Sequence, residues 1–415
     1  MLGLLTQLLI SEHKRMTSST SPRKPQARKK IPFWRDERVL TAAAQVISAI
    51  IVIGGIIWIA INLLEAANRR GLSLGFDFIN DPAGFPISES VIPFDDSYPF
   101  GTAFLVGLLN TLKVSIIGIL LATILGTVVG LARLSTNWLV NKIALAYIEL
   151  HRNVPLLVLL FIWYFAIFNK LPPAKESIEL PGLIYLNQRG LYLAWPRLTE
   201  TGGVFAISLL VGLILAIIAW IYLRRLRERS GRSTYFAGVS FAVILVAALL
   251  GLMLSAWQPL WIDIPVFEGF NFSAGLRLTP EFAALLVGLV MYTAAFIAEV
   301  VRAGIQAVDF GQMEAAKAVG LKPMQTLGLV IIPQAMRVII PPLISQFLNL
   351  TKNSSLALAI GYADVFNVGR IMINQAGRAV PVFGMVMVTY LVLSLITSAI
   401  LNIYNRKIQI SERDA

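Results

Sequence analysis

The 415-residue sequence contains no cysteine and only two histidines, His13 and His151. Without cysteine the chain can form no disulfide, thiol nucleophile or cysteine metal site, and two histidines cannot build a multi-histidine metal site. The phosphate-binding pattern GxxxxGK[ST] and the zinc-binding pattern HExxH are also absent. We therefore predict no catalytic residues, no bound metal and no ATP site of that type in this chain.

Charged residues are scarce as well: they make up 14% of the sequence, whereas 57% of it is hydrophobic. A soluble domain has roughly 25% charged and 45–50% apolar residues. Runs of about 20 apolar residues recur along the chain, and each is long enough to cross a hydrocarbon core of roughly 30 Å. The composition predicts an all-α polytopic membrane protein with about eight transmembrane helices in the lipid bilayer.

The apolar runs divide the chain into a leader, a membrane domain and a tail. Residues 1–38 are predicted to be a basic, disordered leader, and residues 406–415 a tail. Residues 39–99 hold the first span and the loop after it, and residues 100–405 hold the main transmembrane domain. Spans 1 to 8 are predicted at about residues 39–64, 104–131, 144–168, 204–223, 235–257, 280–301, 338–360 and 382–403. Pro341 and Pro342, and also the polar residues of span 7, are expected to interrupt it.

The distribution of basic residues predicts the orientation. With eight spans both termini lie on one side, and the segments on that side hold 23 Lys and Arg residues, against nine in the opposite loops. The positive-inside rule therefore places both termini in the cytoplasm. The basic leader is expected to lie near anionic lipid, and we expect no nucleic-acid partner.

A polar stretch between spans 6 and 7 carries signals for a short helix. Asp309 can cap a helix N-terminus, and Gln312, three residues later, completes a capping box. Gly320 suits the left-handed position after a helix, and Pro323 discourages its continuation. These signals predict a helix over residues 310–319 on the cytoplasmic surface. The adjacent Ala315 and Ala316 leave it nearly bare, so it is either a docking element or an ordinary surface helix.

Polar residues inside the predicted spans are the other informative feature, because lipid cannot satisfy them. They cluster in span 7 from Asn349 to Ser355, and Thr293 lies midway along span 6. The cluster either lines a pathway for a polar solute or holds helices together by hydrogen bonds. Lys352 could also reach the outer interface. The predicted pathway residues are Thr293, Asn349, Lys352, Asn353, Ser354 and Ser355.

The polar stretch matches a known motif. Glu314-Ala315-Ala316 is followed after three residues by Gly320, and after nine more by Val330-Ile331-Ile332-Pro333. This spacing resembles the EAA loop of bacterial ABC-importer permeases, here within residues 305–335. The segments 295–305, 341–356 and 152–157 resemble the polar-amino-acid (histidine/glutamine-type) permeases. Residues 187–193 are similar to the general L-amino-acid permease subfamily.

The resemblance implies a five-helix type I permease core, made of spans 2, 3, 6, 7 and 8, in the bacterial inner membrane. It implies a second permease subunit, usually a related but different chain, and an extracytoplasmic amino-acid-binding protein. Two cytoplasmic ATPase subunits would bind ATP and magnesium, so this chain would need no cofactor. The residues implied to couple to the ATPase are Asp309, Gln312, Glu314, Ala315, Ala316 and Gly320.

A second hypothesis is a self-sufficient secondary transporter or channel for a small polar solute. Such a protein needs no docking helix for an ATPase, and carriers driven by protons or sodium often have acidic residues at mid-membrane. The cytoplasmic helix and the scarcity of such residues favour the importer permease.

Overall fold

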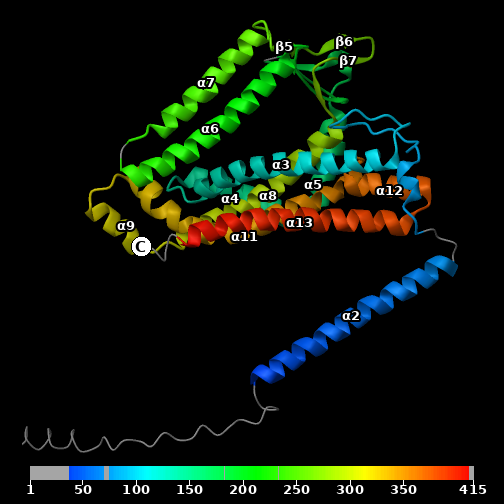
Figure 1. Cartoon of the computed structure of the whole chain (residues 1–415), viewed down its shortest axis with the longest axis horizontal. Helices are drawn as coiled ribbons and strands as arrows, with labels where there is room; N and C mark the ends of the chain where they lie inside the picture. Colours follow the sequence, from blue (N-terminus) through cyan, green and yellow to red (C-terminus); the bar gives the residue numbers. More distant parts are fainter. Residues whose placement is uncertain (1–36, 70–73, 182, 232, 411–415) are drawn as a thin grey trace, which may run out of the picture. The chain divides into compact units, whose positions relative to one another are not determined.

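The computed structural model describes residues 37–69, 74–181, 183–231 and 233–410 (Figure 1). The chain divides between residues 73 and 74 into two compact units. The described part of the first unit is the helix α2 (Glu37–Arg69), which contains the predicted span 1. The predicted leader lies outside the described residues, except for its last two positions, which begin α2.

Helices dominate the second unit, which confirms the predicted fold class. The described chain has seven helices that are long and apolar enough to cross a membrane, or eight if one bent pair is counted as a span. The long helices of the second unit are α3 (Phe100–Arg133), α6 (Gly202–Ser230), α7 (Phe236–Leu254), α8 (Pro280–Gln306), α11 (Ile332–Asn353) and α13 (Ala379–Ile410). The C-terminal tail was predicted from residue 406, but α13 continues to Ile410.

The centre of this unit is the close packing of α3 against α8. A Cβ atom added at Gly126 would lie 2.7 Å from the Ile297 side chain, and one added at Gly130 would lie 2.7 Å from the Ala298 carbonyl oxygen. Two glycines four residues apart let helix backbones approach closely in a membrane. Leu285, Leu289 and Leu350 are fully buried in the resulting core.

Span 3 is not the single helix that was predicted over residues 144–168. It consists of α4 (Trp138–Asn153) and α5 (Leu156–Phe161), which continues through a π-helical stretch, Ile162–Ile167, to Lys170. The two parts meet at an angle of 104°. Pro155 causes the break, because proline disfavours a helical conformation in the residue before it, and Val154 is extended with ψ 128°.

Span 7 also differs from the prediction, because it starts earlier and its prolines do not interrupt it. The candidate span covers Pro323–Ile360, from α10 (Pro323–Thr326) through a π-helical stretch, Leu327–Ile331, into α11. Pro341 and Pro342 lie within α11. The α-helix gives way at the polar cluster, as its polar residues predicted: a 3₁₀ helix, Ser354–Ile360, follows Asn353. A further short helix, α12 (Val365–Ala376), was not predicted.

The loops between spans 3 and 4 and between spans 5 and 6 carry short antiparallel strands, for which no prediction was made. One sheet has the order β1 (Ile178–Leu180), β2 (Ile184–Asn187), β3 (Gly190–Leu193), β8 (Leu276–Leu278). Two-stranded sheets form from β4 (Trp195–Leu198) with β5 (Leu260–Asp263) and from β6 (Val266–Glu268) with β7 (Asn271–Ser273). Gly190 has φ +128°, and a Cβ atom there would lie 2.2 Å from the Leu278 carbonyl oxygen, so this strand crossing requires glycine.

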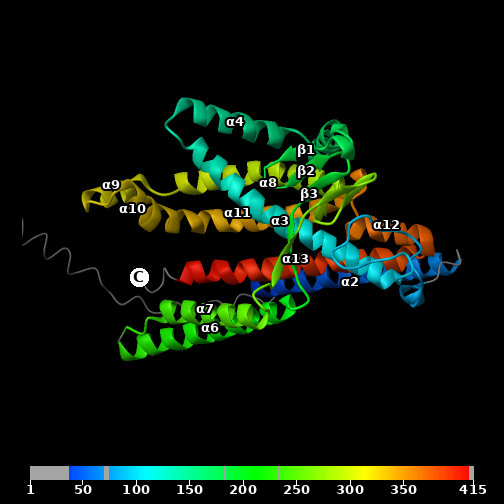
Figure 2. The ribbon, with the colours of Figure 1, turned by 90° about the horizontal axis from the view of Figure 1, so that it is seen from above.

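The ends of the core helices have different structures. The strands and α12 lie toward one end of α8, and the short helix α9 (Phe310–Ala318) follows its other end (Figures 1 and 2). Because α8 has 27 residues, these two ends are about 40 Å apart. The predicted docking helix α9 therefore follows one end of α8, whereas the predicted pathway residue Thr293 lies midway along α8.

Candidate functional site

The helix predicted between spans 6 and 7 forms as α9. Its N-terminus is capped by Asp309, whose Oδ1 accepts a hydrogen bond from the Gly311 N–H at 2.7 Å. After the helix, Gly320 adopts φ +82°. The Gly320 N–H donates to the Lys317 carbonyl at 2.9 Å and the Leu321 N–H donates to the Ala316 carbonyl at 3.1 Å. This is the Schellman arrangement, so the predicted roles of Asp309 and Gly320 as helix caps are confirmed.

Two details of the helix prediction are wrong. Gln312 forms no reciprocal capping box, because its Oε1 accepts a hydrogen bond from Gln334 Nε2 at 3.2 Å instead. Ala316 is buried, so only Ala315 of the alanine pair lies on the exposed surface together with Glu314. Pro323 lies after the end of α9, as predicted, and it occupies the first turn of α10, where its missing N–H has no cost.

Large apolar side chains around α9 are exposed, and none of them was predicted from the sequence as part of a docking surface. Phe310, Val319 and Met324 are 65%, 76% and 78% exposed. They lie at the two ends of α9 and at the start of α10, beside the exposed Glu314 and Ala315. An apolar rim around a small, nearly bare helix is typical of a surface that another protein covers. Their signal in the sequence was their apolar character within an otherwise polar stretch.

A polar cavity of about 280 Å³ lies between α8 and α11. It is lined by Tyr292, Thr293, Phe296, Gln346, Asn349 and Asn353. Three of these residues, Thr293, Asn349 and Asn353, were predicted from the sequence to line the pathway. Gln346 was missed, although residues 346, 349 and 353 have the spacing i, i+3, i+7 that places side chains on one helix face. Helix periodicity could therefore have found it.

The other three predicted pathway residues do not line this cavity. Lys352 and Ser355 line a different, mostly apolar pocket of about 430 Å³ against α12 and α13, with Phe366, Phe383 and Tyr390 among its walls. Ser354 is buried, and its hydroxyl donates to the Thr351 carbonyl at 2.9 Å. The Ser355 hydroxyl donates to the Lys352 carbonyl at 2.8 Å. The predicted cluster is thus divided between two sides of the chain.

Charged groups lie at the α9 side of the polar cavity. Glu299 and Arg302 form a salt bridge on α8, with Arg302 Nε donating to Glu299 Oε2 at 3.0 Å. The guanidinium of Arg152, at the end of α4, lies 5.5 Å from the ring centroid of the cavity residue Phe296. A cation within about 6 Å of an aromatic face is attracted to it. Arg152 therefore supports one wall of the cavity from outside.

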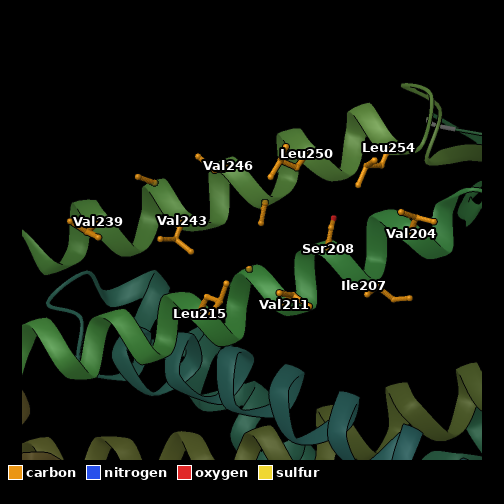
Figure 3. Close-up of a pocket in the computed structure, with 13 residues that line it drawn as sticks. Val204, Ile207, Ser208, Val211, Leu215, Val239, Val243, Val246, Leu250 and Leu254 are labelled. Carbon is orange, nitrogen blue, oxygen red and sulfur yellow. The ribbon is translucent and has the colours of Figure 1, made fainter.

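A wider groove, of about 640 Å³, lies between α6 and α7 and has no comparable chemistry. Figure 3 shows its lining, in which Ser208 contributes the only oxygen among the labelled side chains and the others are aliphatic. Gly212 faces Ala247 and Gly251 faces Ser208 at short distances, so the two helices form a closely packed antiparallel pair. Most of their large apolar side chains are exposed, as expected for helices that face lipid.

The described residues offer no group of three or more His, Cys, Asp or Glu side chains that could hold a metal ion. The chemistry that they offer at the polar cavity is hydrogen bonding by amides and hydroxyls, with two aromatic rings. Among the described residues, the side-chain amides of Gln346, Asn349 and Asn353 form no hydrogen bond to the protein. Such groups can accept and donate to a small polar solute without first breaking a protein contact.

Comparison with known proteins gives a consistent set of relatives. Residues 208–410 match the family model described as the binding-protein-dependent transport system inner membrane component. The chain is 42% identical over 370 residues to the putative amino-acid ABC transporter permease YhdX of Escherichia coli, covering 89% of this chain and 94% of that protein. It is 42% identical over 373 residues to the general L-amino acid transport system permease AapQ of Rhizobium johnstonii, covering 89% and 92%.

A third relative is the glutamate/glutamine/aspartate/asparagine permease BztB of Rhodobacter capsulatus, which is 36% identical over 413 residues and covers 91% of this chain and 96% of that protein. Among solved structures, an amino acid ABC transporter crystallised with histidines matches with a TM-score of 0.44 and 22% identity. That match covers 74% of this chain and 95% of the other.

Proposed function

Because the chain belongs to the family of amino-acid ABC transporter permeases, the binding-protein-dependent inner membrane components, we propose that it forms part of the transmembrane pathway of an ATP-driven amino-acid importer. The class of substrate comes from the names of its relatives, and three of them carry amino acids in their names. Hydrolysis of ATP, with its magnesium ion, takes place on separate ATPase subunits, and this chain binds no cofactor itself.

The single observation that carries the coupling half of this proposal is the geometry of α9. The capped helix presents Glu314 and Ala315 to solvent, and Phe310, Val319 and Met324, at the two ends of α9 and at the start of α10, add exposed apolar surface. A soluble partner with an apolar groove can bury this rim, and the small alanine lets the backbone come close. We assign this partner as an ATPase subunit, with one subunit for each of two permease chains.

The remaining residues proposed for coupling act by shaping α9. Asp309 and Gly320 fix where the helix begins and ends, Ala316 is buried, and Gln312 is bonded to Gln334 of α11. Because α9 is joined directly to α8 and, through α10, to α11, movement of an ATPase would reach both helices that line the polar cavity.

We propose that the polar cavity lies on the solute pathway, with Thr293, Asn349 and Asn353 as its predicted members and Gln346 as an added one. Lys352, Ser354 and Ser355 are assigned to the adjoining pocket and to helix structure, and the second permease subunit is proposed to cover that pocket. The extracytoplasmic binding protein delivers the solute at the end of α8 that carries the strands, and both termini of this chain lie in the cytoplasm.

A self-sufficient secondary transporter or channel is not favoured. The 42% identical relatives, which align over nine-tenths of their length, are ABC permeases. In the described part of α8, the acidic Glu299 is paired with Arg302 on the same helix face, which suits a structural role better than ion coupling.

The proposal is tested by purifying the tagged chain from its native membrane together with the subunits bound to it. We expect an ATPase chain to copurify, and we expect its ATP hydrolysis to rise when the binding protein and one or more amino acids are added. Each amino acid added singly then identifies the substrates. Purification of the chain alone in a form that transports an amino acid would refute the proposal.

A further inference from the structure

Glu89, in the segment before α3, is a buried carboxylate at the end of α8 opposite to α9. It is 7% exposed, although it lies in a segment without regular structure. Its Oε2 accepts hydrogen bonds from the Thr279 N–H at 3.1 Å and from the Thr279 hydroxyl at 2.5 Å. Thr279 is the N-cap residue of α8, so the carboxylate is bonded to the residue that caps that helix.

The other oxygen of Glu89 contacts α3. Glu89 Oε1 forms an ion pair with Lys113 Nζ, and Lys113 also lies over the Phe282 ring, 4.3 Å from its centroid. The backbone of Glu89 is bonded to α3 as well, since Asn110 Nδ2 donates to the Glu89 carbonyl at 2.8 Å. The same amide donates to the Ala363 carbonyl at 2.9 Å. Glu89 thus connects α3 to the N-cap of α8, and Asn110 links it to the segment that leads into α12.

The rest of the Glu89 loop, residues 74–99, packs on only one of the two hydrophobic cores. Phe78, Ala83 and Phe85 are buried in a cluster whose other members come from α3, from α12 and the segment before it, and from α13. The residues of α8 belong to the other core cluster. The loop is therefore fixed to α3, α12 and α13 by apolar packing, and the Glu89 carboxylate bonds it to Thr279, the N-cap residue of α8.

This end of α8 leads toward the polar cavity. Phe282 and Leu285 are buried between Thr279 and the cavity residue Thr293, which lies about 20 Å farther along the helix. The Phe282 ring contacts Tyr362 with centroids 5.7 Å apart, and the Tyr362 hydroxyl donates to the Asn110 carbonyl at 3.2 Å. Buried aromatic and apolar side chains thus close this end, and the contacts of Glu89 lie beside them.

We propose that Glu89 is the latch of the pathway at its binding-protein end: its hydrogen bonds to Thr279 break when the pathway opens there and form again when it closes. This inference rests on the proposed function, and it makes Glu89 a positioning residue that need not touch the solute. A buried ion pair adds little stability compared with apolar packing, but in some proteins buried charged groups select one arrangement over its alternatives, which is the property a latch needs.

The latch is tested in a chain that has no native cysteine, which makes introduced thiols specific. Glu89→Cys and Thr279→Cys are combined, and the complex is treated with a short bis-methanethiosulfonate that a reductant releases. We expect crosslinked complexes in vesicles to lose amino-acid uptake and to regain it after reduction. A contact that only supports the fold would not block uptake when locked, so full uptake by the crosslinked form would overturn the latch.

Two controls separate the latch from other effects. Ala216→Cys with Ser240→Cys crosslinks α6 to α7, where the Ser240 hydroxyl donates to the Ala216 carbonyl at 3.1 Å, and it should leave uptake unchanged. The unmodified complex tests the proposed function by itself: if it takes up no amino acid with ATP, the importer proposal fails, whereas inhibition confined to the crosslinked form supports the latch.

A second variant gives a readout that does not depend on crosslinking. Glu89→Gln keeps the shape of the side chain but removes the charge that binds Lys113. We expect ATP hydrolysis without amino acid to rise about fivefold or more, the lower range of coupling between sites. Glu228→Gln removes an exposed partner of Arg224 on α6 and should have no such effect. Unchanged hydrolysis in the Glu89→Gln complex would also overturn the latch.

Discussion

Gly320→Pro is expected to abolish ATP-driven uptake while leaving the chain inserted in the membrane. Gly320 has φ +82°, whereas proline fixes φ near −65°, and the substitution also removes the N–H that donates to the Lys317 carbonyl. The end of α9 would therefore unwind. The cause is the backbone conformation and not a steric clash, because nothing lies within 4 Å of the position where a Cβ would be added. Uptake into vesicles and the amount of ATPase retained by the purified chain measure the effect.

The matched control is Gly231→Pro. Gly231 follows α6 with φ +65°, its N–H donates to the Arg227 carbonyl at 3.0 Å, and its surroundings are equally open. Gly231 therefore ends α6 in the left-handed conformation, as Gly320 does after α9, but it lies in the α6 and α7 pair. We expect this variant to keep its uptake and its ATPase. Equal losses in both variants would mean that Gly320 matters only for helix structure, and full uptake by Gly320→Pro would refute a coupling role for α9.

Glu314→Lys is the companion variant, because it reverses an exposed charge on α9 and leaves both caps in place. We expect the same loss of uptake as for Gly320→Pro.

Asn349→Leu is expected to lower amino-acid uptake by about tenfold or more. The substitution keeps the approximate size of the side chain but removes an amide that lines the polar cavity and forms no hydrogen bond to the described protein. If this amide binds the solute, its loss leaves a polar group of the solute unpaired, at a cost of about 1–3 kcal/mol. The initial rate of uptake at low amino-acid concentration is the measurement, compared at equal amounts of complex.

Asn402→Leu provides the control for the cavity variant. Asn402 is an exposed amide near the end of α13 that donates to the Ser398 hydroxyl, away from the lining of the cavity. We expect it to transport like the unmodified chain. Lys352→Met tests the division of the predicted cluster, because Lys352 lines the other pocket. A larger loss for Lys352→Met than for Asn349→Leu would place the pathway on the α12 and α13 side instead.

The sequence predicted the features that depend on local chemistry. Long apolar runs located the membrane helices, and Asp309 and Gly320 marked the two ends of α9 because each acts within one helix turn. The 104° break in span 3 was also local in origin, but its signal, Pro155, was not used. Proline alone would not have decided the matter, since Pro341 and Pro342 are tolerated inside α11.

The features that the sequence did not predict depend on contacts between distant segments. Strand β3 pairs with β8, so residues 191–193 meet residues 276–278 across two inserted helices. The polar cluster of span 7 was read as one group, although helix geometry sends Asn349 and Lys352 into different pockets. Glu89 lies in a loop, and its role becomes visible only when Thr279 and Lys113 are brought to it by the fold.

The most direct test of the central claim is amino-acid accumulation in vesicles that contain the purified complex, with the binding protein outside and ATP with magnesium enclosed. We predict accumulation against a concentration gradient that requires enclosed ATP and the ATPase subunits, and that persists when ion gradients are collapsed. Accumulation that continues without the ATPase subunits, driven by a proton or sodium gradient, would contradict the account.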